Sequence, residues 1–298
     1  MLIALTGATG FVGGRTLDVL LDRGRRVRAL TRRARPARDG VEWVEGALDR
    51  PDRLDALATG AEAVIHVAGV VRAPNRAGFG AGNVHGTRAV VEAAAGAGVR
   101  RLVHVSSLAA REPDLSLYGW SKAEAERVVE TSALDWTIVR PPAVYGPGDL
   151  EQLDVFRLAK RGLALLPPPG LMSAIMVDDL AALLATLAER GGPKTTYEPD
   201  DGHPLAHADY ARAIGRSLGR TVLPLPLPAA LLRLGAWADG RLRGADAKLT
   251  PDRASYMTHP DWTADPARRP PLDLWTPRVP LAQGLAETAR WYRAQGLL

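Results

Sequence analysis

The chain has 298 residues, of which 46% are apolar and 24% charged, enough for one large hydrophobic core and a smaller appended domain. The absence of cysteine excludes disulfides and thiolate chemistry, and no apolar run approaches the ~18 to 20 residues of a membrane span. The net charge of +5 comes from arginines spread along the chain, which is typical of solvated helix faces. We therefore expect a cytoplasmic protein without a signal peptide, a nucleic-acid partner or stable membrane insertion.

Short β-branched runs alternate with helical patterns over the first 140 residues. The expected strands are 2–5, 27–31, 42–45, 63–67, 101–106 and 136–140. The expected helices are 13–22, 52–58, 84–97 and 118–131. This alternation predicts an α/β fold with a doubly wound parallel sheet.

Proline-rich segments after residue 140 predict a second, smaller and mainly C-terminal domain. We expect a dinucleotide-binding domain at 1–147 and about 172–200, and a discontinuous substrate domain at about 148–171 and 201–298. Within the latter, the apolar run 229–238 predicts a helix that packs in the core. A substrate lid or a contact with a membrane surface remain alternatives for this helix.

A glycine-rich turn follows the first expected strand directly. Gly7 allows a tight turn, Gly10 lets the backbone approach a pyrophosphate, and Gly13 lets the helix pack on the strand. The helix N-terminus then faces the phosphate charge. An ordinary strand-to-helix connection can share this pattern, but we expect a nicotinamide dinucleotide site. Its expected contacts are Gly7, Thr9, Gly10, Phe11, Val12 and Gly13.

The choice of coenzyme is expected at the end of the second strand. Thr31 stands where an acidic side chain would bind the ribose hydroxyls of NAD, and Arg32 and Arg33 follow at once. A guanidinium offers a planar fork of donors to a phosphate. These residues therefore predict a preference for NADP(H), with NAD(H) possible, unless the arginines only form a basic surface loop.

Tyr118 and Lys122 are four residues apart, so on one helix they share a face. An ammonium near the phenol is expected to lower its pKa from ~10 and to make Tyr118 a general acid or base. Ser107, at the end of the strand 101–106, is expected to hydrogen-bond the substrate oxygen, although Ser106 could face the substrate instead. The alternative for the Tyr118 and Lys122 pair is an exposed helix surface without function.

Six segments in the expected strand order carry a family resemblance. They are 6–13, 66–69, 83–87, 105–107, 118–122 and 140–148. Through them nearly the whole chain resembles the extended short-chain dehydrogenase/reductases (SDR), a superfamily that includes NAD-dependent epimerases and dehydratases. The closest motifs are those of the dihydroflavonol-reductase and 3β-hydroxysteroid-dehydrogenase branch. The resemblance implies a Rossmann fold and a possible homodimer through helices 84–97 and 118–131.

The resemblance also implies roles for individual residues. Ser107, Tyr118 and Lys122 would be catalytic, with Lys122 also holding the ribose hydroxyls. Asn83 would be a structural or proton-relay residue, although an asparagine at a helix start is also a common N-cap. The further cofactor contacts that it implies are Leu48, Ala68, Gly69, Pro141 and Val144.

Departures from the epimerase pattern bear on the substrate. Ala143 stands where sugar-nucleotide epimerases carry asparagine, and segment 172–179 lacks their arginine and histidine. These losses argue against a nucleotide sugar. We expect an oxidoreductase that transfers a hydride between NADP(H) and a small-molecule ketone, aldehyde or alcohol. The alternatives are an epimerase or dehydratase without net redox change and a nonenzymatic NADP-binding or assembly protein. No metal site is expected, since Pro204 separates His203 from His207.

Overall fold

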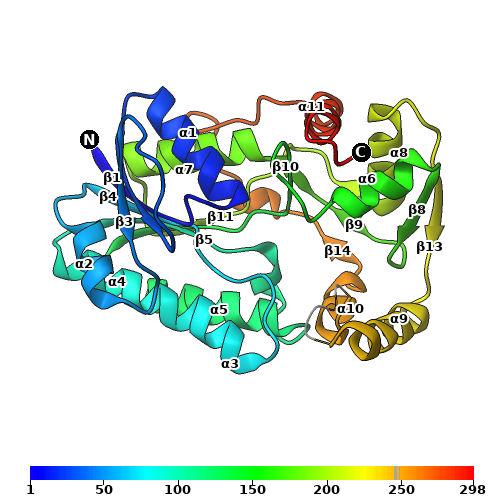
Figure 1. The fold of residues 1–298 in the computed structure, drawn as a ribbon, viewed down its shortest axis with the longest axis horizontal. Coiled ribbons are helices and arrows are strands. Elements are labelled where there is room, and N and C mark those ends of the chain that lie inside the picture. Colours follow the sequence, from blue (N-terminus) through cyan, green and yellow to red (C-terminus); the bar gives the residue numbers. More distant parts are fainter. Residues whose placement is uncertain (245–246, 248) are drawn as a thin grey trace. The chain divides into compact units, whose positions relative to one another are not determined.

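The computed structural model describes residues 1–244, 247 and 249–298. Its largest element is a parallel sheet with the strand order β11-β6-β5-β4-β1-β2-β3 (Figure 1). The strands are β1 (Leu2–Thr6), β2 (Arg26–Thr31), β3 (Val41–Glu45), β4 (Ala63–His66), β5 (Arg101–Val105), β6 (Asp135–Val139) and β11 (Thr195–Tyr197). The order reverses between β1 and β4, which confirms the predicted doubly wound Rossmann sheet.

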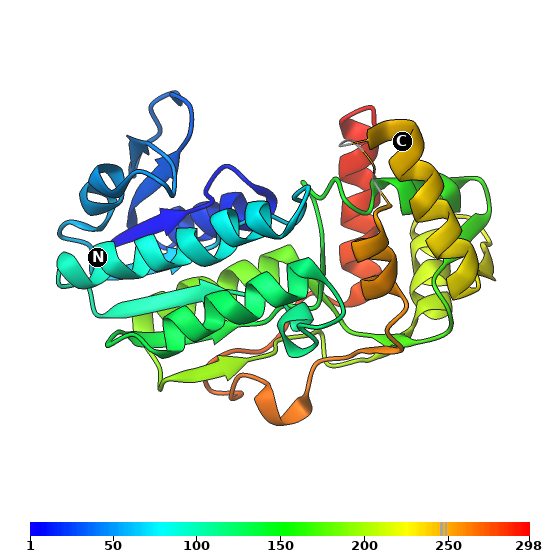
Figure 2. The same cartoon turned by 90° about the horizontal axis from the view of Figure 1, so that it is seen from below.

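Helices cover both faces of this sheet (Figure 1). One face carries α1 (Phe11–Asp22) and α7 (Val177–Arg190), and the other carries α2 (Pro51–Ala58), α4 (Gly86–Gly96) and α5 (Leu117–Glu130). Figure 2 shows α4 and α5 side by side along the sheet. Short helical turns precede α4 and α5, namely α3 (Arg76–Phe79), the π-helical η1 (Gly80–His85) and the 3-10 helix η2 (Leu108–Arg111).

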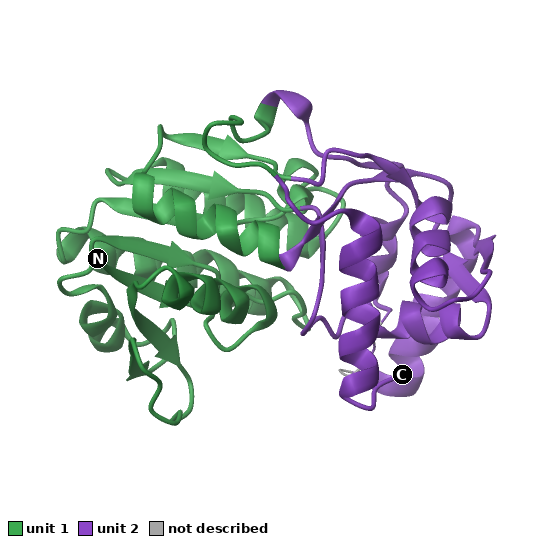
Figure 3. Cartoon of the chain, turned by 90° about the horizontal axis from the view of Figure 1, so that it is seen from above, with its two compact units in different colours: residues 1–141, 178–199, 268–276 green, residues 142–177, 200–267, 277–298 purple. Residues whose placement is uncertain are grey.

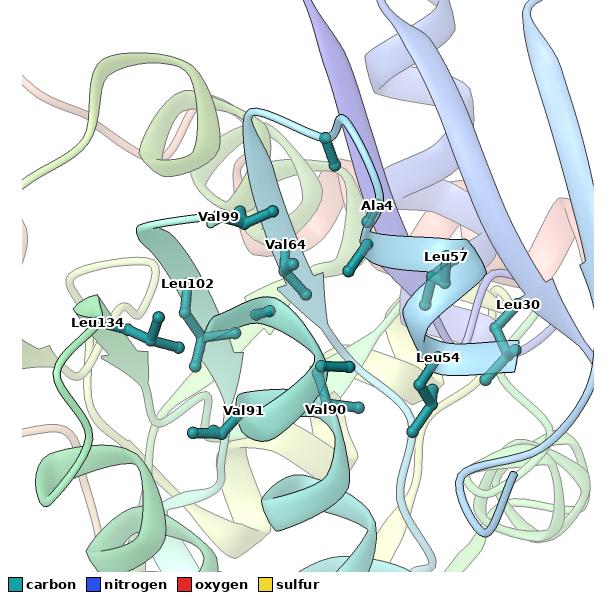
Figure 4. Packing of buried hydrophobic residues seen from close by; sticks show 14 of the residues in the cluster. Ala4, Leu30, Leu54, Leu57, Val64, Val90, Val91, Val99, Leu102 and Leu134 are labelled. Carbon is teal, nitrogen blue, oxygen red and sulfur yellow. The ribbon is translucent and has the colours of Figure 1, made fainter. Parts of the chain in front are cut away.

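The core between the sheet and the second helix layer is aliphatic (Figure 4). Leu54 and Leu57 of α2 and Val90 and Val91 of α4 pack with strand residues such as Val64. Each helix contributes apolar residues at helical spacing, and the central strands β1, β4 and β5 are buried on both faces. These buried contacts hold the strands in place. The site described below is built on the carboxyl ends of these strands.

The chain forms two compact units (Figure 3). Unit 1 comprises Met1–Pro141, Asp178–Pro199 and Arg268–Thr276, and unit 2 comprises Pro142–Val177, Asp200–Ala267 and Pro277–Leu298. The strands of unit 2 are β7 (Ala143–Tyr145), β8 (Leu163–Leu166), β9 (Leu171–Met172), β10 (Ala174–Met176), β12 (Leu205–Ala206), β13 (Leu223–Pro226) and β14 (Asp261–Trp262). Its helices are α6 (Leu153–Lys160), α8 (His207–Ser217), α9 (Ala229–Arg243), α10 (Pro251–Met257) and α11 (Leu281–Ala294), and the 3-10 turn η4 (Pro266–Arg268) spans the boundary between the units. Within the described parts of the chain, no helix is long and apolar enough to cross a membrane.

The helix predicted over the apolar run 229–238 is α9, but its predicted core position is only partly correct. Leu232 and Ala236 pack against Ala254, whereas Leu234 and Trp237 are exposed. Leu232 and Ala236 lie one helical turn apart, so the buried side of α9 is only a narrow stripe.

Asp149 lies among aromatic residues of the unit 2 core. Its carboxylate is buried, and Oδ1 accepts a hydrogen bond of 2.7 Å from the backbone N–H of Glu151. Burial is the main cause that raises the pKa of Asp149 from 3.8 to about 6. Because the folded state then binds a proton that the unfolded state releases, stability decreases as the pH rises from about 4 to about 6.

We therefore expect Asp149→Asn, which keeps the acceptor of Oδ1, to stabilise the protein at pH 7 by up to about 3 kcal/mol. At pH 4 the two proteins should differ little. Urea unfolding of both proteins at the two pH values measures this difference. The matched control is Asp209→Asn on the exposed start of α8, which should leave the pH dependence unchanged. A gain of equal size at both pH values would contradict the assignment to Asp149.

Candidate functional site

The site in unit 1 begins at the turn between β1 and α1. Gly7 has φ +78°, and a Cβ at this position would lie 2.8 Å from the backbone nitrogen of Ala68. At Gly13 a Cβ would lie 2.1 Å from the carbonyl oxygen of Gly7. Only glycine fits either position without backbone movement. The two glycines therefore make the tight turn and the close helix contact that the sequence predicts.

The N-terminus of α1 is open at this turn. Gly10 is its N-cap, no side chain caps the helix, and its first turn contains no acidic residue. Thr9 and Gly10 are exposed, while Phe11 and Val12 are partly buried. Unsatisfied N–H groups at the positive end of a helix dipole bind phosphate well. The glycine-lined turn and this free helix end fit a dinucleotide.

The end of β2 presents the predicted arginines. The buried Thr31 donates a hydrogen bond of 2.7 Å from Oγ1 to the carbonyl oxygen of Arg33, and Oγ1 accepts one of 3.3 Å from the Arg33 N–H. This local turn leaves Arg32 and Arg33 exposed. In the described ranges neither guanidinium forms an ion pair, whereas Arg38 nearby binds Asp18 at 2.7 Å. Both arginines are thus available to an anionic ligand.

Ser107 and Tyr118 are hydrogen-bonded through their side chains. Ser107 caps η2, where its Oγ accepts a hydrogen bond of 3.2 Å from the Ala109 N–H. Helix α5 passes so close to η2 that a Cβ on Gly119 would lie 2.6 Å from the Ala109 carbonyl oxygen. Ser106, the alternative, is buried, and its Oγ has no partner among the described residues. The structure therefore brings Ser107, and not Ser106, to Tyr118.

The predicted effect of Lys122 on Tyr118 is wrong for this structure. Burial raises the pKa of Tyr118, and the hydrogen bond from Ser107 opposes this rise, whereas Lys122 does not contribute. The Lys122 ammonium instead donates a hydrogen bond of 2.8 Å to the carbonyl oxygen of Val105 on β5. Burial lowers the pKa of Lys122 itself to about 8, although the nearby Glu126 carboxylate opposes this shift. The shared helix face therefore did not determine the partner of the ammonium, which is a backbone carbonyl of β5.

Asn83 fixes the loop that follows β4. Its Oδ1 accepts a hydrogen bond of 2.7 Å from the Val70 N–H, and its Nδ2 donates to the Val70 carbonyl oxygen at 2.9 Å and to Ser121 Oγ at 2.8 Å. Asn83 lies inside η1, so the N-cap alternative is wrong. A Cβ on Gly69 would lie 2.8 Å from Asn83 Oδ1. The amide thus holds the backbone of Ala68 to Val70 beside Lys122.

The sequence did not reveal a buried hydrogen-bond chain beneath the glycine turn. Thr6 Oγ1 lies 2.7 Å from His66 Nδ1, and His66 Nε2 lies 3.1 Å from Thr87 Oγ1. Burial is the main cause that lowers the pKa of His66 to about 3, so the ring is neutral. The chain joins β1, β4 and α4. The presence of His66 and Thr87 in two of the matching motif segments is the signal that could have indicated it.

A second unexpected feature is a buried ionic network that begins one helical turn from Lys122. The Arg140 guanidinium binds the two oxygens of Glu126 at 2.8 and 2.5 Å and Glu198 at 3.4 Å. Arg111 binds the other oxygen of Glu198 at 3.2 Å. Glu126 and Glu198 are both buried. The network joins α5 and η2 to the residues that follow β6 and β11, because two buried carboxylates require fixed cations.

The remaining predicted contacts lie in both units. Leu48 packs against α4, where a Cβ on Gly86 would lie 2.6 Å from its Cδ1. Pro141 accepts a hydrogen bond of 3.2 Å from the Leu108 N–H through its carbonyl oxygen. Val144 lies on β7 of unit 2, so its predicted contact with the cofactor stays a prediction. The other predicted site residues all belong to unit 1.

Comparison with known proteins agrees with this geometry. Residues 7–189 match the family described as NAD(P)H-binding. A ceramide reductase of Caulobacter vibrioides is 38% identical, over 99% of this chain and 96% of the relative. A UDP-glucose 4-epimerase of Vibrio cholerae is 26% identical, over 97% of this chain and 94% of the relative.

Solved structures share the fold over the whole chain. The crystal structure of gox2253 has a TM-score of 0.78 at 25% identity and covers 100% of this chain and 99% of that chain. An NAD-bound short-chain dehydrogenase/reductase superfamily protein from Agrobacterium tumefaciens has a TM-score of 0.74 at 21% identity, with 99% and 98% coverage. The chain belongs to the NAD(P)H-binding family and is an NAD(P)-dependent oxidoreductase of the extended short-chain dehydrogenase/reductase type.

Proposed function

We propose that the chain is an NADPH-dependent reductase that converts a ketone on a hydrophobic, lipid-like substrate to the alcohol. The observation that carries the proposal is the hydrogen-bonded pair of Ser107 and Tyr118 at the carboxyl end of β5, in the unit that contains the open glycine turn. The relative at 38% identity that is named a ceramide reductase supports a lipid-like substrate.

The chemistry divides between the coenzyme and the side chains. When bound, the reduced nicotinamide supplies the hydride to the carbonyl carbon. Ser107 holds the carbonyl oxygen, and the Tyr118 hydroxyl gives its proton to that oxygen, so the product is a neutral alcohol. The Tyr118 phenol is protonated at neutral pH, as this donation requires, and burial, which raises its pKa, makes it a weaker acid than a solvent-exposed tyrosine. Lys122 contributes a buried positive charge for the ribose hydroxyls.

A preference for NADPH is proposed from the exposed arginines after β2. Arg32→Ala is expected to weaken NADPH binding by at least about 10-fold, since a charge-assisted hydrogen bond contributes ~1.5 to 3 kcal/mol. The affinity for NADH should change little. Calorimetric titration of the nucleotide-free protein with both coenzymes measures this, and Arg38→Ala, whose guanidinium already binds Asp18, is the matched control. Equal losses for both coenzymes would contradict a phosphate contact at Arg32.

The reaction class is tested by NADPH consumption. The assay compares a ceramide-like long-chain ketone in detergent with a short water-soluble ketone and with UDP-glucose. We expect stoichiometric oxidation of NADPH with the long-chain ketone only. Conversion of a substrate with no net change in coenzyme, together with NAD retained through purification, would replace the proposal by the epimerase or dehydratase alternative. Coenzyme binding without any turnover would favour the nonenzymatic alternative.

A further inference from the structure

We propose that an apolar surface of unit 2, formed by α9 and the β8–β13 ribbon, docks the protein on an anionic lipid bilayer. This inference deepens the proposed function, because a lipid-like ketone dissolved in a membrane must be reached at the membrane surface. It rests on two exposed apolar features that are adjacent in the chain and on the charge around them. The docking is peripheral, since the described helices include none that could span a membrane.

The first feature is the two-stranded parallel ribbon of β8 and β13. In its register Leu163 pairs with Leu223, and Leu165 pairs with Leu225. Alternate residues of a strand point to the same side, so the four leucines share one face. Their exposed fractions lie between 37% and 59%, while Ala164 between them is buried. The ribbon therefore presents a leucine face to solvent, where such a face has no folding benefit.

The second feature is the outer side of α9. Leu232 and Ala236 face inward, and the opposite side carries Leu234 and Trp237, which are 59% and 56% exposed, with Leu231 beside them at 52%. Helix α9 starts three residues after β13 ends, so the ribbon leads directly into it (Figure 1). Exposed leucine and tryptophan side chains on a helix are suited to the boundary between lipid headgroups and acyl chains.

Charge selects the occupant of this surface. The segments 160–170 and 220–243, which contain the ribbon and all of α9, have six basic residues and one acidic residue, Asp239, which pairs with Arg243 on the same helix. Among them Lys160, Arg161, Arg220 and Arg233 are exposed beside the apolar side chains. The guanidinium of Arg241, on the same helix, lies 4.9 Å from the Trp237 ring centroid. Leucine and tryptophan bordered by cations complement a bilayer with anionic headgroups, whereas a second copy would bring the same cations together.

Co-sedimentation of the full-length protein with vesicles tests the proposal without coenzyme or substrate. Vesicles of phosphatidylcholine with phosphatidylglycerol are compared with vesicles of phosphatidylcholine alone. We expect binding to the former, at least 10-fold weaker binding to the latter, and release by ~1 M salt. Because no turnover is measured, failure of this proposal is separate from failure of the reductase assignment.

Three double variants locate the surface. Leu234→Gln with Trp237→Gln and Leu223→Gln with Leu225→Gln should each weaken binding about 10-fold. Arg220→Gln with Arg233→Gln should reduce the preference for anionic vesicles. Leu272→Gln, which changes an 85% exposed leucine of unit 1, is the matched control and should bind as the unmodified protein does.

Binding that survives unchanged in either apolar double variant would overturn the proposal, as would equal weakening in the Leu272→Gln control. Analytical ultracentrifugation tests the alternative that this surface binds a second copy of the chain. Absence of vesicle binding, together with a dimer that the apolar variants dissociate, would assign the surface to a second copy of the chain and would also overturn the proposal.

Discussion

Replacing Tyr118 with phenylalanine is expected to lower kcat by about 10³-fold, within the range of general acid catalysis, while the Kd for the coenzyme changes little. The substitution removes only the hydroxyl that bonds Ser107. The ring keeps its place beside Phe79, whose centroid lies 6.3 Å away, so the helix should retain its packing. Single-turnover rates of ketone reduction, with coenzyme affinity measured in parallel, give both quantities.

Tyr197→Phe is the matched control for this experiment, since it removes a hydroxyl from another tyrosine of unit 1, on β11. It should leave kcat unchanged. Unchanged turnover in Tyr118→Phe would remove Tyr118 from the proton transfer.

Ser107→Ala provides a second test of this pair. Because the Ser107 hydrogen bond lowers the pKa of Tyr118, its loss should shift the pH at which the rate of alcohol oxidation rises to a higher value. A purely structural role of Ser107 would leave that pH unchanged.

The largest expected effect on stability is that of Arg140→Leu. This change removes the guanidinium that binds both oxygens of the buried Glu126. The same guanidinium is also one of the positive groups that bind Glu198. An uncompensated buried charge typically costs about 3 to 5 kcal/mol. The melting temperature should therefore fall by on the order of 10 °C. Thermal unfolding followed by circular dichroism at neutral pH measures this difference.

A surface ion pair on α5, the helix that carries Glu126, provides the comparison. Arg127 pairs with Glu124 on the exposed side of α5, and Arg127→Leu should change stability by less than about 0.5 kcal/mol. If Arg140→Leu is as mild as Arg127→Leu, the buried network does not stabilise unit 1. Arg140→Lys should fall between them, because it keeps the charge but loses the planar fork.

Features that depend on local sequence could be predicted. Strand and helix periodicity located all six expected strands and all four expected helices, because each buries a regular apolar stripe. The conformation of Gly7 and the close contact at Gly13 followed from spacing within one turn. The family resemblance implied that Ser107 and Tyr118 belong to one site, and the structure pairs their side chains.

Features set by three-dimensional burial could not be predicted. The Lys122 ammonium is bound by a backbone carbonyl of β5, which no side-chain pattern reveals. The π-helical turn around Asn83 and the network of Glu126, Arg140 and Glu198 depend on contacts between elements distant in sequence. Hydropathy identified α9 as a helix but not which of its sides lacks a protein neighbour.

The division of the chain into units has a consequence for how this enzyme can be cut and recombined. The chain passes between units after residues 141, 177, 199, 267 and 276. A single truncation point therefore never yields an intact unit 1, because β11 and the segment 268–276 are encoded beyond the first part of unit 2. Exchange of unit 2 with that of a relative requires the replacement of three segments at five junctions, and during synthesis unit 1 stays incomplete until residue 276 has been added.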